Sequence, residues 1–431
     1  MRRATIALTV LFVAMLGGMV WSMRRANLME DERTAAELRM VKIRDFLGKN
    51  LPELKGTMEY LPGSGKARLA LLAASREYLA DLVKEGAADP KSRAHLAAYH
   101  QLTADLEASL AASDLSYYDQ AAENYRKAID LRQDLKDDSE AGRATLIDLH
   151  GRLAQILQQF GKFSEAKTAL RGAPTYRPGK DQLASTKQKA ARLFSMRAYI
   201  ALHEKGAPGA EEDLRRAVGL VEGDTEPQGR YELARATRLL AMLYGHQNRS
   251  VEAQQQAVRS VDTGQALLQQ FPARDDYRRG LAASRTIQAG LVTKAEAERV
   301  ILQAYESAAF VVAGDPYDVQ AGSEFINITL RMAAADHERA EGALEQTRQL
   351  TAPLLEHFPK SYTAATDQVN LAVETARFYR RKGQMKQALE ALKRVLPVAT
   401  EQAATYPGVE SVRGRLRAVQ DEMSAVAGGA K

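Results

Sequence analysis

The hydrophobic positions of residues 147–178 follow the spacing of two amphipathic helices. Leu153 and Leu157 lie four positions apart, which places them on one face of a helix, and Leu170 holds an apolar position in the segment that follows. Gly161 interrupts the pattern between these two segments, as is typical of a tight turn. The pattern therefore predicts an antiparallel helix pair that turns at Gly161.

Small residues occur where the two helices of this unit must approach one another, at Ala154 and Ala166. Related spacings recur at Leu240, Ala241, Tyr244 and Ala253, and at Ala376, Tyr379, Gly383, Ala388 and Leu392. This spacing resembles the tetratricopeptide repeat, a helix-turn-helix unit of roughly 34 residues. A single unit of this kind cannot bury its apolar face alone, so we expect a stack of neighbouring units.

Helical periodicity continues along the rest of the chain, so we predict an all-α fold, a tetratricopeptide-like α-solenoid of antiparallel helix pairs with an N-terminal transmembrane helix. We expect about six or seven pairs, with a last helix that caps the array. Besides the pair within 147–178, the predicted helices cover residues 66–85, 90 onward, 117–135, 182–204, 210–221, 228–246, 251–271, 276–293, 295–313, 318–336, 338–357, 367–382, 384–400 and 409–426.

The segment 4–23 contains 20 residues without a charge, about enough to cross a ~30 Å hydrocarbon core. Trp21 lies at its end, where an aromatic ring suits the membrane interface. We therefore predict four regions: a transmembrane anchor, a juxtamembrane helix with a linker, a repeat domain and a disordered tail, at residues 1–25, 26–65, 66–427 and 428–431. A cleaved signal peptide is the alternative, and it would release a secreted repeat protein.

Composition supports a helical chain and narrows its chemistry. The 60 basic and 54 acidic residues are interspersed, which gives a net charge of +6 without the basic stripe that nucleic-acid binding requires. Because the charges are interspersed, we expect no nucleic-acid partner. The absence of cysteine excludes disulfides, thiolate metal sites and a cysteine nucleophile.

Two stretches, residues 63–102 and 116–135, together with the apolar segment before them, resemble the extracytoplasmic part of bacterial eukaryotic-like serine/threonine kinases. In that family a cytoplasmic kinase domain is followed by one membrane helix and then by tetratricopeptide repeats. The Gly-rich loop, the His-Arg-Asp loop and the Asp-Phe-Gly metal site of a kinase do not occur in this sequence. The resemblance implies the sensor or scaffold half, held in the bacterial inner (plasma) membrane by one span, with its N-terminus cytoplasmic and its repeat domain extracytoplasmic.

The sequence contains no recognisable pattern of catalytic residues. The seven histidines are scattered, without an acidic partner at metal-ligand spacing. No serine elbow, paired-carboxylate signature or dinucleotide glycine fingerprint occurs. We therefore expect a protein that is not an enzyme, with no catalytic, metal or cofactor-binding residues and no cofactor.

In the repeat family the first helix of each pair lines the concave groove that contacts a protein or peptide partner. Carried over by register, the candidate groove residues are Asp148, Gln155, Gln158, Arg235, Arg238, His246, Asn370, Arg377, Arg380 and Arg381. The arginines among them suit the carboxylates of an acidic segment or C-terminus.

Two functional hypotheses follow. In the first, the chain is a membrane-anchored scaffold or sensor that binds a protein or peptide, in signalling or envelope assembly. In the second, it is the regulatory extracytoplasmic part of a split or truncated serine/threonine protein kinase, with a partner kinase that supplies catalysis.

Overall fold

The computed structural model of the chain describes residues 65–429, apart from short gaps at 87–88, 178–182, 204–208 and 407–409. The predicted membrane segment 4–23 lies outside the described residues, as does the predicted juxtamembrane region up to residue 64. Among the helices that are described, none is both long enough and apolar enough to cross a bilayer.

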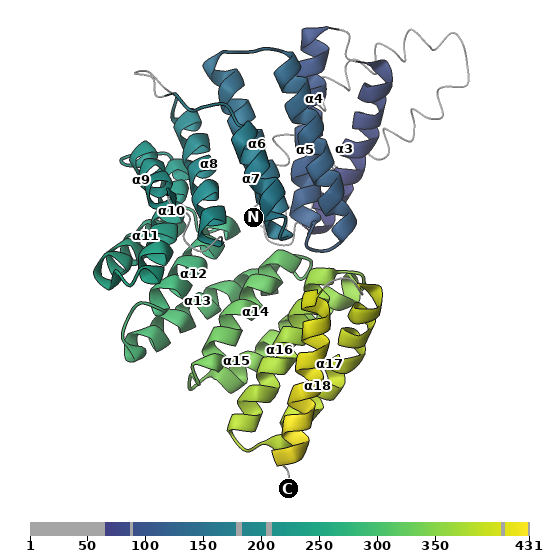
Figure 1. Cartoon of the computed structure of the whole chain (residues 1–431), viewed down its shortest axis with the longest axis vertical. Helices are drawn as coiled ribbons and strands as arrows, with labels where there is room; N and C mark the ends of the chain where they lie inside the picture. The colour runs from purple at the N-terminus through teal and green to yellow at the C-terminus, as the bar shows by residue number, and fades with distance from the viewer. Residues whose placement is uncertain (1–64, 87–88, 178–182, 204–208, 407–409, 430–431) are drawn as a thin grey trace, which may run out of the picture.

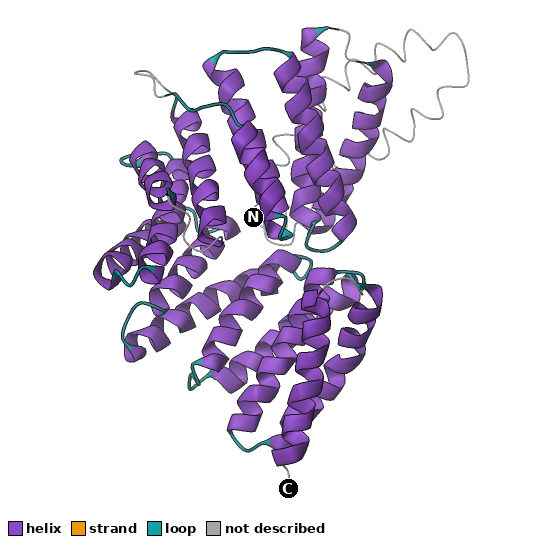
Figure 2. Cartoon of the chain, viewed as in Figure 1, coloured by secondary structure: helices purple, strands orange, loops and turns teal. Residues whose placement is uncertain are grey.

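All regular structure within the described residues is α-helical (Figure 2). Seven antiparallel pairs follow α3, namely α4 with α5, α6 with α7, and so on to α16 with α17, and α18 packs on the last pair. The 16 helices of this part of the chain are α3 (Gly65–Glu85), α4 (Pro90–Leu110), α5 (Leu115–Asp134), α6 (Glu140–Gln159), α7 (Phe163–Gly172), α8 (Ala184–His203), α9 (Ala210–Val221), α10 (Pro227–His246), α11 (Ser250–Gln270), α12 (Asp275–Ala289), α13 (Lys294–Gly314), α14 (Val319–Ala334), α15 (Ala340–His357), α16 (Tyr362–Arg381), α17 (Met385–Thr405) and α18 (Glu410–Gly429).

Small side chains lie where the two helices of a pair meet. The predicted contact residues are all fully buried, which allows the two backbones to approach closely because a methyl group occupies little of the space between them. They are Ala154 with Ala166, Ala241 with Ala253, and Ala376 with Ala388. Together with the stacking of successive pairs, this geometry is that of a tetratricopeptide-like α-solenoid, as the sequence predicts.

The predicted turn at Gly161 is confirmed, and the turns at Asn248 and Gly383 share its backbone geometry. Gly161, Asn248 and Gly383 each adopt a positive φ, between 58° and 75°. The following N–H then bonds back across the end of the helix, as in the 2.9 Å bond from Lys162 N to the carbonyl of Leu157. Glycine and asparagine adopt this conformation at the lowest cost, which explains why the sequence signals these turns.

Several predicted helix ends are wrong. α6 begins at Glu140 rather than at residue 147, and α17 ends at Thr405 rather than at residue 400. α16 begins at Tyr362 rather than at residue 367, because the hydroxyl of Ser361 accepts a hydrogen bond from Ala364 N at 3.0 Å and caps the helix. α12 ends at Ala289 rather than at residue 293. α18 continues to Gly429 rather than ending at residue 426, since buried Val426 anchors its last turns against the preceding pair.

The stack curves until its two halves meet, so that α3 to α7 face α14 to α18 across a central space (Figure 1). The backbone N–H of Gly65, at the start of α3, donates to Asp315 Oδ2 at 3.2 Å in the connection between α13 and α14. A Cβ at Gly65 would lie 2.7 Å from Tyr317 Cβ, so this close approach requires glycine. The superhelix therefore closes on itself within the described residues.

Candidate ligand-binding cavity

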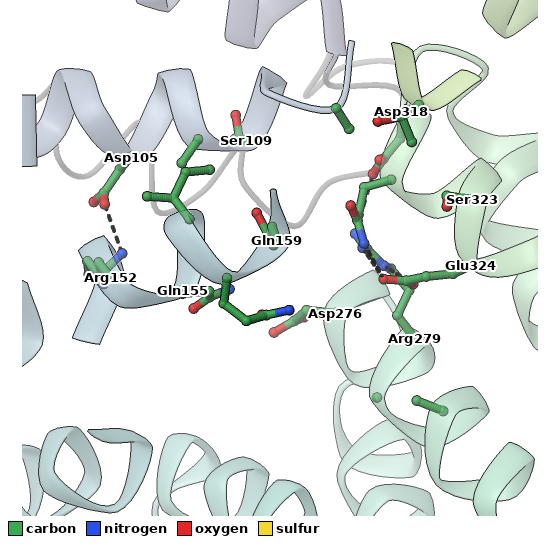
Figure 3. Close-up of a pocket in the computed structure, with 18 of the residues that line it drawn as sticks. Asp105, Ser109, Arg152, Gln155, Gln159, Asp276, Arg279, Asp318, Ser323 and Glu324 are labelled. Atoms are coloured by element: carbon green, nitrogen blue, oxygen red, sulfur yellow. Dashed lines mark hydrogen bonds and ion pairs between the residues drawn. The ribbon is translucent and has the colours of Figure 1, made fainter. Parts of the chain in front are cut away.

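The curved stack of helices surrounds a cavity of about 1090 Å³ that is open to solvent. The first helices of the pairs build most of its wall, from α4 to α14, while the second helices lie mainly outside. Figure 3 shows polar side chains of α4, α6, α12 and α14 around one shared space, with Arg152 on one wall and Arg279 on another. The first helices thus line the concave face, as the repeat resemblance implies.

A ladder of ion pairs joins the first helices along one wall. The Tyr125 hydroxyl donates to Asp105 Oδ1 at 2.6 Å, and the same oxygen lies 2.9 Å from Arg152 Nη1. Arg152 Nε also donates to Asp148 Oδ2 at 2.8 Å, and Asp148 Oδ1 lies 3.5 Å from Arg192 Nη1. The ladder therefore runs from α4 through α6 to α8.

The ladder ends on α10, where Arg192 Nε donates to Oε1 of the buried Glu232 at 2.9 Å. Burial by itself disfavours the ionised form of Asp148, but Arg152 and Arg192 overcome this effect and lower its pKa below the usual value. Burial likewise opposes the charge of Arg152, and the facing carboxylates Asp105 and Asp148 raise its pKa well above the usual value. These groups remain ionised inside the wall and hold the helices in a fixed register.

A second set of ion pairs lies on the wall formed by α12 and α14. Arg279 makes a two-pronged contact with Glu324, through Nε at 2.8 Å and Nη2 at 2.7 Å, and its Nη1 lies 3.5 Å from Asp318. Arg68 of α3 reaches Asp315 at 3.5 Å and so belongs to the same wall. Planar paired contacts of this kind restrict the orientation of a guanidinium more than a single bond does.

Among the described residues, two arginines of α10 have no carboxylate oxygen within 3.5 Å. Arg235 Nη1 lies 3.9 Å from Glu232 Oε2, and Arg238 Nη1 donates to the carbonyl of Gly280 at 3.2 Å. Burial lowers the pKa of Arg238, and the like charge of Arg235 acts in the same direction. This part of the wall therefore carries positive charge that the protein itself neutralises incompletely.

The cavity brings together four of the ten candidate groove residues, Gln155, Gln158, Arg235 and Arg238, and all four line it. Asp148 is buried within the ion-pair ladder behind this surface. The other candidates lie elsewhere. His246 is exposed at the C-terminal end of α10, and half-buried Asn370 on α16 does not line the cavity.

The three C-terminal arginine candidates lie outside the cavity and contact the protein's own acidic side chains. Arg377 and Arg380 both pair with Glu422 of α18. Arg381 pairs with Asp336 at 3.0 Å and donates to the carbonyl of Ala333 at 2.8 Å. The structure therefore does not bring them to the same surface as Arg235 and Arg238, and their role in partner binding stays a prediction.

Sequence reasoning missed most of the charged residues of the wall, including Arg152, Arg192 and Arg279. Their signal is a charge that recurs on successive first helices. The bonded pairs Arg152 with Asp105, Arg192 with Glu232, and Arg279 with Glu324 are 47, 40 and 45 positions apart. A search for opposite charges at the repeat-to-repeat spacing would have found them.

No protein-family model matches this chain, and no curated protein matches it. Among solved structures, the chain is similar to a monomeric mutant of IFIT1 with Gppp-AAAA, at 14% identity and a TM-score of 0.48, over 84% of this chain and 70% of that one. It is similar to the apo form of RapI, at 10% identity and a TM-score of 0.41, over 89% of this chain and 97% of that one. For the tetratricopeptide repeat sensor PH0952 of Pyrococcus horikoshii, a STAND protein, the identity is 12% and the TM-score 0.40, over 83% of this chain and 52% of that one. At such identities a likeness concerns the fold alone.

Proposed function

We propose that this chain is a scaffold or sensor that binds an extended peptide segment of a partner protein in its central cavity. The observation that carries the proposal is the cavity itself, which the first helices of successive pairs line. Its volume of about 1090 Å³ lies at the upper end of the range of about 300–1,000 Å³ that is usual for small-molecule pockets, so it has room for a segment of polypeptide.

The wall offers the chemistry that a peptide backbone requires. An extended backbone presents both N–H donors and carbonyl acceptors, and each must be paired once it leaves water. Side-chain amides both donate and accept hydrogen bonds, so they suit this task. Five glutamines line the cavity, Gln155, Gln158 and Gln159 on α6, Gln228 on α10, and Gln320 on α14.

The ion-pair ladder supports binding by keeping the wall in place before a ligand arrives. Asp148 contacts both Arg152 and Arg192, so α6 and α8 are joined through one buried carboxylate. A rigid wall loses less conformational entropy when a ligand binds, and more of the contact energy then contributes to affinity.

The decisive experiment blocks the cavity with one bulky side chain. Random peptides displayed on phage are selected on the purified full chain, and the affinities of recovered peptides are measured by fluorescence polarisation. Gln155→Trp introduces an indole into the cavity wall, so we expect it to weaken these peptides at least about tenfold.

Gln255→Trp is the matched control, because Gln255 is an exposed residue of α11 outside the cavity. We expect this variant to bind the peptides as the unaltered chain does. Recovery of no binding peptide, or equal affinity for the two tryptophan variants, would contradict the proposal.

The proposal includes attachment to the bacterial inner membrane by segment 4–23, with the N-terminus cytoplasmic and the repeat domain extracytoplasmic. The uncharged 20-residue run and the terminal Trp21 support it. Protease treatment of intact cells and of spheroplasts tests the topology. We expect the repeat domain to be cleaved only after the outer layers are removed, and protection in spheroplasts would contradict this orientation.

Signalling together with a serine/threonine kinase is the finer form of the proposal. The resemblance of residues 63–102 and 116–135 to the outer part of such kinases supports it. Sequencing the DNA upstream of Met1 tests this form. An adjacent or in-frame kinase coding region would favour a regulatory role, and its absence would favour an independent scaffold.

A further inference from the structure

The arginines of the cavity wall fall into two groups. Arg68, Arg152, Arg192 and Arg279 each have a carboxylate oxygen within 3.5 Å. Arg235 and Arg238 have none this close among the described residues. A guanidinium in a partly buried wall has lost most of its hydration. Without a close anion, no ion-pair attraction offsets this cost in free energy.

The nearest carboxylate, that of Glu232, forms a hydrogen bond with neither arginine. Glu232 is fully buried, and its Oε1 already accepts hydrogen bonds from Arg192 Nε at 2.9 Å and from Gln228 Nε2 at 3.0 Å. Its remaining oxygen lies 3.9 Å from Arg235, too far for a hydrogen bond. Both arginines therefore retain donors that no carboxylate among the described residues accepts.

Geometry brings the two side chains to one site. Arg235 and Arg238 are three positions apart on α10, so they share a helix face, and both line the cavity. Tyr199 of α8 and Tyr231 of α10 line the same cavity, and both rings lie within electrostatic reach of the two guanidinium groups. Two guanidinium forks beside two phenol rings form a donor-rich recess with aromatic sides.

We propose that Arg235 and Arg238 form the site that binds an aspartate or glutamate side chain of the peptide held in the cavity. This inference rests on the proposed function and specifies its ligand as an acidic peptide. A guanidinium fork matches the two oxygens of a carboxylate, and the charge-assisted bonds that result are among the stronger ones in proteins.

The rest of the wall restricts how acidic the ligand is. Asp318 and Glu324 line the cavity together with Asp275, whose pKa burial raises to about 6. These carboxylates repel a continuous polyanion such as a nucleic acid strand. A peptide that places one or a few carboxylates at α10 and neutral or basic groups elsewhere avoids that repulsion.

The experiment extends the selection of displayed peptides to charge variants of the full chain. Selection on the unaltered chain should enrich aspartate and glutamate in the recovered peptides relative to the unselected library. Recovered acidic peptides should bind Arg235→Gln/Arg238→Gln at least about tenfold more weakly. Arg394→Gln, at an exposed residue of α17, is the matched control and should retain full affinity.

A melting curve separates a binding role from a structural one. Removal of two neighbouring like charges should leave the melting temperature unchanged or raise it. A loss of affinity without a fall in the melting temperature therefore supports the site. A lowered melting temperature would overturn it, because the arginines would then be stabilising the wall instead.

The outcomes distinguish this inference from the function on which it rests. If recovered peptides are not enriched in acidic residues but are still blocked by Gln155→Trp, the cavity binds peptides and the arginine site is overturned. If inorganic phosphate binds at Arg235 and Arg238 but acidic peptides do not, the site is a phosphate site and the proposal fails. If no peptide is recovered at all, both proposals fail.

Discussion

The hydroxyl of Ser361 donates a hydrogen bond to the carbonyl of Ala112 at 2.7 Å, across 249 positions of sequence. The same hydroxyl accepts the N–H of Ala364 and so caps α16. Phe358 and Ala112 pack around this contact in a small apolar cluster with Leu354. One side chain thus begins a helix and also joins the N-terminal and C-terminal halves of the superhelix beside the cavity.

Loss of this contact should loosen the ring. Ser361→Asp retains an oxygen that caps α16, since aspartate is as good an N-cap as serine, but its carboxylate cannot donate to Ala112. We expect it to cost about 1–3 kcal/mol in the free energy of unfolding, because the part-buried carbonyl of Ala112 is left unpaired beside a negative charge. Combined with Arg68→Gln, which removes the contact to Asp315, it should increase the radius of gyration measured by small-angle X-ray scattering.

Ser361→Asn is the matched control, because its amide both caps the helix and donates a hydrogen bond. It should retain the radius of gyration of the unaltered chain. Equal scattering curves for the two double variants, each carrying Arg68→Gln, would mean that the Ser361 contact does not hold the ring closed.

The helices were predictable because their signals are local. Gly161 and Gly383 mark turns that need a positive φ, and alanines such as Ala154 and Ala166 mark the contacts within a pair. A chain of short-range rules is sufficient to predict a solenoid, since each pair packs mainly on its neighbours. The Asp336 turn adopts the same positive φ, 49°, without glycine or asparagine.

Closure of the ring was not predictable in the same way. The contact of Gly65 with Asp315 joins residues 250 positions apart and depends on the curvature accumulated over the intervening pairs. The candidate site was predicted in part for a related reason. The first-helix register selected Arg235 and Arg238, which line the cavity, and their role in binding stays a prediction. It also selected Arg380, which pairs with Glu422 of α18, because a register identifies a face of a helix and not what packs on that face.

The pairing of Glu422 with Arg377 and Arg380 predicts a stabilising role for these arginines. Glu422→Gln removes a buried negative charge and leaves both guanidinium groups without it. We expect a loss of about 1–3 kcal/mol in the free energy of unfolding and faster amide hydrogen exchange in α18. The affinity for peptides selected on the cavity should not change.

Glu401→Gln is the control for this prediction, because Glu401 is an exposed residue of α17. It should alter neither stability nor exchange in α18. If Glu422→Gln instead lost peptide affinity without faster exchange in α18, the arginines of α16 would contact the peptide. That is the role that the first-helix register predicts for them.

The buried carboxyl of Asp367 predicts a pH dependence of stability. Burial raises its pKa to about 6 from an ordinary value of 3.8, against the opposing effects of Ser323 and of Arg415 on α18. Between these two values the folded chain holds a proton that the unfolded chain has lost. The contribution of Asp367 to stability is therefore fully favourable below about pH 4 and decreases as the pH rises towards about 6.

Asp367→Asn removes this titration and retains a neutral side chain of nearly the same shape. Above about pH 6 it should be more stable than the unaltered chain by about 1–3 kcal/mol, because it avoids burying a carboxylate that lacks a partner at Oδ2. Urea unfolding of both proteins from pH 4 to pH 8 measures the difference, and other acids cancel in the comparison. Asp421→Asn, at an exposed site on α18, should give no such difference. A constant difference between Asp367→Asn and the unaltered chain across this range would mean that Asp367 is ionised in the folded protein throughout, and that water or Arg415 compensates its charge.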